Sequence, residues 1–343
     1  MRLEDLFGGY NDKKTKIKAI KIFGMKFTFR KFMNIRGKIL RYELPNHLEG
    51  RYIYKGTDGN EIYSKVIKTG KPAMLARLGG TEMNIVKYFY DRKDKQLNVK
   101  YPKALKREAK LLPGIFSAEE DNDTLVRFSS EVLNYLRDVD VLAVWNCFRH
   151  TKYYTTKVQM LEDYANPRLK LTDTEVIVRG MFAQNSWTKQ LKGKKVLVIS
   201  PFTETIKSQY EKRKLLFKDE DILPDFDLKL IKAPQGIGEN NLLDQYRSWF
   251  SALKSMEDEM DRTDYDILLV GAGAYGFHLA HHAKEMGKIG IHVAGALQLL
   301  FGIKGGRWTG LEFINEHWVS PSEKETPKNN TTFVKMEGSN AYW

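Results

Sequence analysis

Short continuous runs of apolar residues alternate along the chain with longer segments in which apolar positions recur every three or four residues. A short apolar run without intervening polar positions is typical of a strand buried on both faces, as in a parallel sheet covered by helices. Segments with this pattern are predicted to be strands, at residues 73–78, 141–145, 195–200, 228–232, 266–270 and 288–293.

Helices are expected between these strands, at residues 81–92, 123–136, 204–217, 241–262 and 275–285, with a short one at 296–301. The alternation predicts an α/β fold of the Rossmann-like, doubly wound type with a mostly parallel sheet. We expect residues 46–343 to form one main domain, with the polar segment after residue 308 wrapping it as loop. In open sheets of this type, ligands bind at the carboxyl ends of the strands.

Residues 1–45 differ from this domain in charge. Eleven Lys or Arg residues and no acid lie between Lys13 and Tyr42, which leaves about +2 of the net charge of +13 for the rest of the chain. Apolar residues interleave with these cations, so residues 13–42 are predicted to lie on an anionic membrane surface, at roughly 1 kcal/mol per cation. A solvated extension or a strand pair packed on the domain is the structural alternative, and nucleic-acid binding is the less favoured functional one.

Composition limits the cellular compartments in which the protein is expected. Hydrophobic residues make up 42% of the 343 residues, as in a globular chain, and no apolar run is long enough to span a membrane. The first residues lack the apolar core of a signal peptide. Cys147 is the single cysteine, which excludes an intrachain disulfide and fits a reducing compartment. We therefore expect a cytoplasmic protein that associates peripherally with the inner face of the cell membrane.

A glycine-rich loop follows the predicted strand at 266–270. Gly271-Ala-Gly273-Ala-Tyr275-Gly276 has the spacing G-x-G-x-x-G between a strand and a helix, where glycines expose backbone N–H groups to a pyrophosphate. A dinucleotide site also places an acid about 20 residues later to bind the ribose, and Ile291 and His292 stand there. This argues against NAD or FAD. A mononucleotide or sugar phosphate remains open, as does a turn that only packs closely.

A second strand-to-helix loop reads Arg77-Leu-Gly79-Gly80-Thr81-Glu82. Thr81 is the expected helix cap, and Glu82 then lies in the first turn, where the helix dipole favours an acid. The functional alternative places Glu82 in the crevice as a metal ligand or general base. Arg77, at the end of a buried strand, needs an anionic partner, and a diphosphate provides one.

The third loop, residues 199–205, also joins a strand to a helix, and we expect Thr203 to cap that helix or to contact the ligand. Lys207 follows within the next turn as a candidate anion contact. His292, Gln298 and Arg307 are candidate anion or sugar contacts. For His292, a hydrogen bond donated to a phosphate and a satisfied core position are both open.

The remaining reactive side chains are assigned structural roles. His278, His281 and His282 share one predicted helix but present no third ligand for a metal, so they are expected to be packing or surface residues. Cys147 lies near His150, yet nothing marks a group that would orient that histidine. Neither a G-x-S-x-G elbow nor a Walker A motif is present, which argues against an α/β-hydrolase and a P-loop NTPase.

Arg77-Leu-Gly-Gly-Thr-Glu82 resembles the Arg-x-Gly-Asp-Gly-Glu motif of bacterial glycosyltransferases with the GT-D fold. Further stretches are similar to hypothetical proteins of polysaccharide and capsule loci that resemble this group, and the basic segment Lys21–Lys26 is similar to the cationic leaders of such transferases. The stretches are Ser200-Pro-Phe202, Thr205-Ile-Lys-Ser-Gln-Tyr210, Gly271–Gly276, Ile291-His-Val-Ala-Gly295, Gln298-Leu-Leu-Phe-Gly302, Lys304-Gly-Gly-Arg-Trp308, Thr326-Pro-Lys328 and Tyr342-Trp343.

The resemblance implies transfer of a sugar from a nucleotide-sugar, with a UDP-sugar favoured, to a glycan or lipid-linked acceptor of the cell envelope or capsule. It also implies that the Asp-x-Glu pair assists Mn²⁺ or Mg²⁺. Here Gly80 replaces the aspartate, so Glu82 alone is the expected metal ligand or base, with His292 as the second catalytic candidate. The expected donor contacts are Arg77, Gly79, Gly80, Thr81, Thr203, Lys207, Gly271, Gly273, Tyr275, Gly276, Gln298 and Arg307.

Two rival functions remain open at the level of sequence. The first is a non-catalytic protein that binds a nucleotide or sugar phosphate, and the missing aspartate favours it. The second is a dehydrogenase, which would bind NAD, and the absence of a ribose-binding acid speaks against it.

Overall fold

The computed structural model describes residues 47–48, 51–94, 98–118, 121–144, 159–236, 242–306, 311, 313–326 and 342. The predictions for the basic segment 13–42, for Cys147 with His150, and for Arg307 lie outside these residues.

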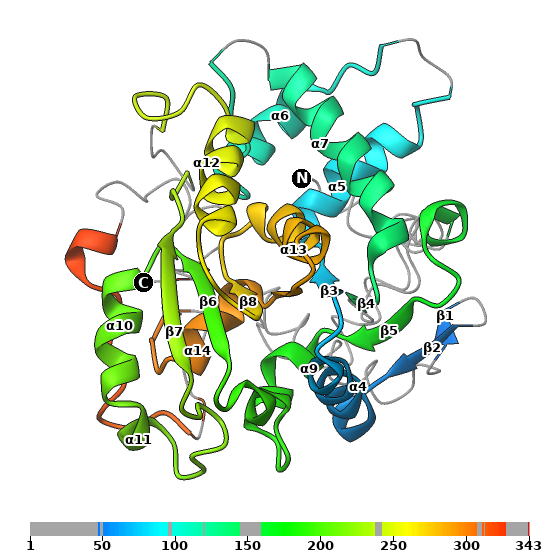
Figure 1. Cartoon of the computed structure of the whole chain (residues 1–343). Helices are drawn as coiled ribbons and strands as arrows, with labels where there is room; N and C mark the ends of the chain where they lie inside the picture. The colour runs from blue at the N-terminus through cyan, green and yellow to red at the C-terminus, as the bar shows by residue number, and fades with distance from the viewer. Residues whose placement is uncertain are drawn as a thin grey trace, which may run out of the picture.

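A nine-stranded sheet forms the centre of the molecule, in the order β1-β2-β5-β4-β3-β9-β8-β6-β7 (Figure 1). All neighbouring strands are parallel except β1, which pairs antiparallel with β2 at one edge. The α/β, Rossmann-like fold class is therefore confirmed. The strands are β1 His47–Leu48, β2 Arg51–Tyr54, β3 Ala73–Arg77, β4 Val141–Val144, β5 Lys170–Asp173, β6 Lys195–Ser200, β7 Asp227–Lys232, β8 Ile267–Val270 and β9 Ile289–His292.

Helices cover both faces of the sheet, and successive strand residues enter opposite cores. In β3, Met74 and Ala76 join the cluster beneath α5, α7, α12 and α13, whereas Ala73 and Leu75 join the cluster beneath α4, α9, α10 and α14. This two-sided burial explains the continuous apolar runs in the sequence. The helices are α4 Gly56–Thr69, α5 Gly80–Tyr90, α6 Lys103–Leu111, α7 Asp121–Tyr135, α9 Glu175–Val178, α10 Thr203–Glu211, α11 Arg213–Leu216, α12 Trp249–Asp261, α13 Tyr275–Glu285 and α14 Leu297–Leu300.

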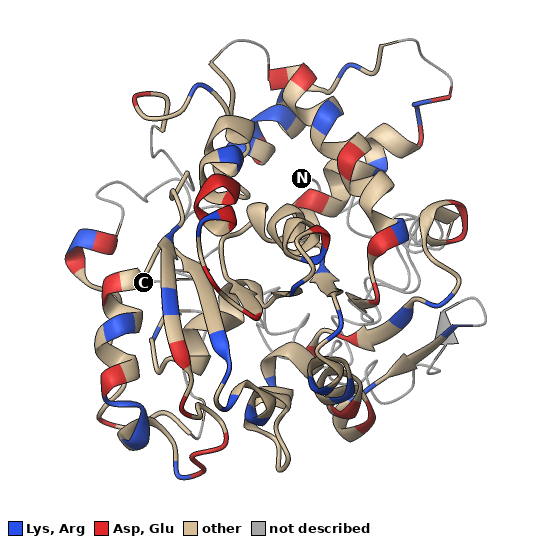
Figure 2. Ribbon diagram, viewed as in Figure 1, with Lys and Arg blue, Asp and Glu red and all other residues tan. Residues whose placement is uncertain are grey.

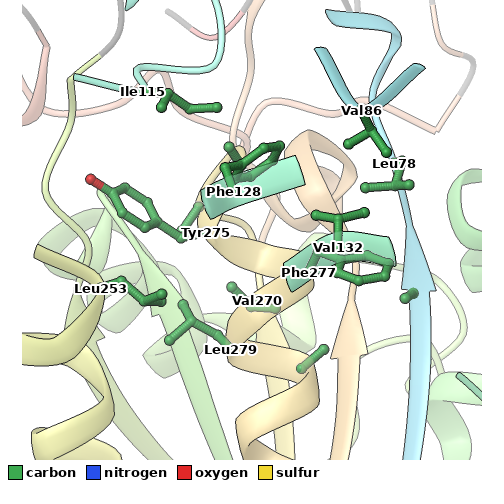
Figure 3. Packing of buried hydrophobic residues seen from close by; sticks show 14 of the residues in the cluster. Leu78, Val86, Ile115, Phe128, Val132, Leu253, Val270, Tyr275, Phe277 and Leu279 are labelled. Atoms are coloured by element: carbon green, nitrogen blue, oxygen red, sulfur yellow. The ribbon is translucent and has the colours of Figure 1, made fainter. Parts of the chain in front are cut away.

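The first of these cores is built from large side chains that interlock. Figure 3 shows Val132 of α7 against Phe277 of α13, with Phe128 of α7 nearby, and Leu253 of α12 next to Leu279 of α13. Phe128 packs edge-to-face on Trp249, with ring centroids 5.4 Å apart. Outside the cores, acidic and basic residues are interspersed over the helices (Figure 2), as expected for a domain of low net charge.

The six predicted strands are all present with ends shifted by two residues or fewer, and the predicted helix 275–285 is α13. The predicted helices 81–92 and 123–136 are α5 and α7 with ends shifted by two residues or fewer, and two other predictions differ more. The segment 241–262 becomes helical only at Trp249, because Ser248 and Ser251 form a capping box there. The segment 204–217 divides into α10 and α11, and 296–301 is the short α14. Strands β2 and β5 and helices α4 and α6 were not predicted.

The direction of winding changes in the middle of the sheet. From β3 the chain proceeds through α5 to β4 and then to β5, toward one edge; from β6 it proceeds through α10 to β7, at the other edge. Helices α5 and α10 belong to opposite cores. The loops that leave β3 and β6 therefore diverge, which opens a crevice at the carboxyl ends of β3, β9, β8 and β6. Among the helices described, none is long and apolar enough to cross a bilayer.

Candidate functional site

A cleft of about 410 Å³ lies at this divergence, within the size range of small-molecule sites. Most of the residues proposed from sequence as donor contacts line it, together with Glu82 and His292. They come from the ends of β3, β8 and β9: Arg77, Gly79, Gly80, Thr81, Glu82, Gly271, Gly273, Tyr275, His292 and Gln298. The structure thus brings together three loops that are up to about 220 residues apart in the sequence.

The β8–α13 loop has backbone donors without a hydrogen-bond partner among the described residues, and part of it lines the cleft. The Gly271 N–H donates to the carbonyl of Ile199 at 2.9 Å, and the N–H groups of Tyr275 and Gly276 are used in turns within the loop. The three N–H groups between them, at residues 272–274, make no hydrogen bond within the described part of the chain. Gly273 has φ +54°, a left-handed backbone conformation, and both Ala272 and Gly273 line the cleft. This is the geometry of an anion-binding nest at a helix N-terminus.

The other two glycines of this motif are required by packing. A Cβ at Gly271 would lie 2.7 Å from Leu297 Cδ2, and a Cβ at Gly276 would lie 2.3 Å from the His292 ring. Gly276 does not line the cleft but packs against the ring of His292, which does. The glycines of the motif therefore have different reasons to be glycine. Gly271 and Gly276 are required by close packing, and Gly273 is required by its left-handed backbone.

Tyr275, which opens α13, has a buried ring and a buried hydroxyl. Its ring stacks on Trp249 with centroids 4.7 Å apart and an interplanar angle of 3°. The hydroxyl points away from Phe277 (Figure 3) and has no hydrogen-bond partner among the described residues. Burial raises the pKa of this hydroxyl far above its ordinary value, so it is a neutral donor or acceptor at one wall of the cleft.

The β3–α5 loop differs from its prediction at the helix cap. The N-cap is Gly79, and Thr81 is already inside α5 and makes no cap. Glu82 is the third residue of the helix, and its carboxylate folds back over Gly79, where a Cβ would lie 2.2 Å from Oε2. A first-turn glutamate in this position is favoured by the helix dipole. Glu82 nevertheless remains half-buried at the cleft surface, so both alternatives for this residue stay open.

Arg77 and His292 meet at the junction of β3 and β9. The Nδ1 atom of His292 lies 2.9 Å from the Arg77 carbonyl and donates to it when the ring is neutral. Burial lowers the pKa of His292 to about 3, with the Arg77 guanidinium adding to the effect, while the carbonyls of Arg77 and Gly273 act in the opposite direction. The neutral ring has one N–H, and the Arg77 carbonyl uses it. His292 is therefore placed to tie two loops together, and its catalytic role remains a prediction.

The prediction for the third loop is wrong in part. Ser200, Pro201 and Phe202 line the cleft, but Thr203 and Lys207 do not. The N-cap of α10 is Phe202 rather than Thr203. The N-terminus of this helix already holds an anion of the protein itself, because the N–H groups at residues 204 and 205 donate to the Glu325 carboxylate at 2.7 and 3.2 Å.

That carboxylate is fixed by further contacts, since the side chains of Thr205 and Ser322 also donate to it. Glu325 is 4% exposed. Lys207 projects from the exposed side of α10. Sequence reasoning could not find this occupant, because Glu325 lies 120 residues beyond the helix that it caps.

Three parts of the cleft were not predicted as site residues. Leu112 and Pro113 follow α6, residues 234–236 follow β7, and Tyr342 comes from the C-terminal segment. Gln298 donates from Nε2 to the Tyr342 carbonyl at 2.7 Å, and the Tyr342 ring lies over Gly295. The Pro and Gly residues after α6 and β7 mark turns, but only the sheet order shows that these turns reach the cleft.

The described residues contain no cluster of three His, Cys, Asp or Glu side chains suited to a metal ion. Among the described residues that line the cleft, Glu82 is the one carboxylate. The histidines of α13 take structural roles, as expected. His278 is buried against Phe128 and Trp249 with Nε2 3.2 Å from a Glu131 carboxylate oxygen, and His281 stacks on Tyr135.

No protein-family model matches the chain, and no curated protein matches it in sequence. Among solved structures, the chain is similar to one described as "Selenomethionine substituted structure of domain of unknown function 1792 (DUF1792)". The identity is 10%, the TM-score is 0.43, and the match covers 85% of this chain and 96% of that chain. A likeness at this level says nothing of substrate or chemistry.

Proposed function

We propose that the protein is a glycosyltransferase that binds a nucleotide-sugar in the cleft and transfers the sugar to a glycan or lipid-linked acceptor. The observation that carries the proposal is the nest at residues 272–274, whose N–H groups have no hydrogen-bond partner among the described residues and of which Ala272 and Gly273 line the same cleft as Arg77 and Glu82. A diphosphate carries the charge that the nest and the guanidinium can neutralise. Glu82 supplies a carboxylate within the same cleft.

Each group has a distinct task in this proposal. The nest and Arg77 hold the diphosphate and stabilise the charge that develops on it as the glycosidic bond breaks. Glu82 accepts the proton of the attacking acceptor hydroxyl. His292, at the end of β9, holds the end of β3 through its Nδ1 hydrogen bond to the Arg77 carbonyl, and its ring packs on Gly276 of α13. The loops after α6 and β7, which also line the cleft, help to exclude water from the diphosphate.

The described residues do not fit a metal ion held by the protein. Mn²⁺ and Mg²⁺ are bound by several oxygen ligands, and the described cleft lining offers one carboxylate, already folded back over Gly79. Gly80 stands where the related motif has its aspartate. Neutralisation of the leaving diphosphate is therefore assigned to Arg77 and the backbone donors, with no step through a metal.

The cellular setting belongs to the same proposal. A lipid-linked acceptor of the cell envelope or capsule lies at the membrane, and the eleven cations between Lys13 and Tyr42 would bring the enzyme to an anionic surface. The expected location is the cytoplasmic side of the cell membrane, held peripherally.

A second function, binding of a nucleotide or sugar phosphate without catalysis, is favoured by one specific observation. The Glu82 carboxylate folds back over Gly79, and stabilising the start of α5 would be enough to explain that position. No second described carboxylate lines the cleft. Such a protein would bind the donor without turning it over.

Donor hydrolysis and transfer by purified protein, with Glu82→Gln as the variant, test the proposal. Loss of the base is expected to lower kcat by roughly 10²–10⁴ with little change in donor affinity. Glu204→Gln is the matched control, because Glu204 is an exposed acid in the first turn of α10, outside the cleft. Full transfer activity in Glu82→Gln would contradict the role of Glu82. Donor binding by the wild-type protein without any turnover would favour the second function.

A further inference from the structure

One end of the cleft contains a buried acceptor that nothing in the described chain satisfies. Gln298 is 4% exposed and lines the cleft, and its Oε1 atom has no hydrogen-bond partner among the described residues. Its Nε2 atom donates to the Tyr342 carbonyl at 2.7 Å, which fixes which way the amide is turned. A buried acceptor without a partner costs free energy, so a ligand that donates a hydrogen bond to Oε1 is expected there.

The surroundings of this acceptor are apolar and aromatic. Phe202 and Leu297 line the cleft with Gln298, and the Tyr342 ring lies over Gly295, where a Cβ would be 2.8 Å from Cε1. This part of the cleft lies on the α10 side. Gln209 of α10 donates a hydrogen bond to the carbonyl of Gly302, in the segment that follows α14.

The charged part of the cleft lies toward the opposite side. Arg77 and Glu82 come from the loop that follows β3, whereas Leu297, the neighbour of Gln298, packs on Gly271 at the end of β8, two strands away across β9. At about 4.8 Å per strand, these two positions are roughly 10 Å apart, and the nest at residues 272–274 also follows β8. A nucleoside diphosphate attached to a sugar is long enough to extend over such a distance.

We propose that the cleft binds its ligand in one direction, with the nucleobase against the Tyr342 ring and Gln298 Oε1, the diphosphate on the nest and Arg77, and the sugar at Glu82. This rests on the proposed function. A sugar at the Gln298 end would leave several hydroxyl groups without partners, because the walls there offer chiefly apolar surface. A base has two flat apolar faces for an aromatic wall and an N–H edge for Oε1.

Isothermal titration of the full-length chain with inorganic pyrophosphate and with UDP, GDP, CDP and ADP tests this direction. At least one nucleoside diphosphate should bind roughly tenfold or more tightly than pyrophosphate, as expected from one stacked and hydrogen-bonded base. Gln298→Leu and Tyr342→Ala should each remove most of that advantage and leave the Kd of pyrophosphate within about twofold. Tyr342→Phe, which keeps the ring, should behave as the wild-type protein.

Lys207→Ala serves as the control outside the cleft, and circular dichroism spectra of the variants verify their folding. The proposal is overturned if no nucleoside diphosphate binds more tightly than pyrophosphate, or if the folded variants keep the wild-type ratio. Should Gln298→Leu fail to fold, Tyr342→Ala alone decides the outcome. Failure of the proposed function gives a different result. If the protein binds a nucleoside diphosphate selectively but does not turn over any donor, the base subsite is supported and the transferase function is not.

Discussion

Gly276 of the glycine motif does not line the cleft, but it packs against a residue that does. Its missing Cβ makes room for the His292 ring, and that ring in turn binds the end of β3 through the Arg77 carbonyl. The sequence motif predicted a phosphate loop, and the structure shows that packing requires two of its three glycines. Such a division cannot be made from sequence, because His292 and Leu297 come close to these glycines only in the folded chain.

Gly276→Ala is expected to destabilise the fold by about 1–3 kcal/mol, because the new methyl group would lie 2.3 Å from the buried His292 ring. Urea unfolding measures the change. Gly80→Ala is the matched control, since nothing lies within 4 Å of a Cβ there and the residue is in the first turn of a helix. Equal stability of the two variants would contradict this account of the packing.

The buried His292 gives the protein a specific dependence on pH. Its pKa of about 3 in the folded chain lies below the value of about 6.5 expected in the unfolded chain. Below pH 6.5 the unfolded chain therefore binds a proton that the folded chain does not. The stability that this group contributes is complete above pH 6.5 and decreases as the pH falls toward 3.

His292→Asn removes this titration while keeping a side-chain donor for the Arg77 carbonyl. Between pH 7 and pH 5 the wild-type protein should lose about 2 kcal/mol more of its free energy of unfolding than the variant does. Chemical denaturation at a series of pH values gives both curves, and the difference between them cancels the contribution of other groups, such as His278, whose pKa burial also lowers. Parallel curves would show that His292 is not buried in its neutral form.

At the level of elements, strand prediction succeeded where both faces are apolar and failed where they are not. The core of β8 is the continuous run Ile267–Val270, whereas β2 reads Arg-Tyr-Ile-Tyr and β5 reads Lys-Leu-Thr-Asp. The latter two strands lie toward one edge of the sheet and end in polar positions, so their sequences resemble loops. Their identity as strands depends on pairing with each other and, for β5, with β4, which is a property of the folded sheet.

Helix α10 illustrates the same limit at the candidate site. Its loop has the sequence features of a ligand-binding turn, and its N-terminus does hold an anion, but the anion is the Glu325 carboxylate. The local sequence predicted that the N-terminus of α10 could bind an anion. Which anion it binds depends on a tertiary contact with Glu325. The C-terminal segment is thereby fixed to the domain at residues 322–326.

Glu325→Ala is expected to destabilise the protein by about 1–3 kcal/mol, because it leaves the backbone donor at residue 204 and the buried donors of Thr205 without an acceptor. Hydrogen exchange should show faster exchange of those two amides. Glu323→Ala, an exposed acid in the same short turn, is the control and should change little. If both variants exchange at the wild-type rate, Glu325 does not hold the C-terminal segment.

On the scale of the whole molecule, the alternation of strands and helices was sufficient to predict a Rossmann-like sheet and a crevice at its carboxyl edge. The order of the strands decided which loops share that crevice, placing those after β3, β9, β8 and β6 together. Arg77, Glu82 and the nest at residues 272–274 therefore meet although the sequence separates them widely. Residues 234–236 were missed because Pro234 and Gly236 mark only a turn, and Tyr342 was missed because only the folded chain brings the C-terminal segment to the cleft.

Binding of a nucleotide-sugar in this cleft is tested most directly by a thermal-shift screen of the full-length chain. The panel contains UDP-, GDP-, CMP- and dTDP-sugars and NAD, each with and without Mn²⁺. A ligand that binds the folded state raises the melting temperature by mass action, so at least one nucleotide-sugar should raise it, without requiring Mn²⁺. No shift with any nucleotide-sugar, or a shift with NAD alone, would contradict the account.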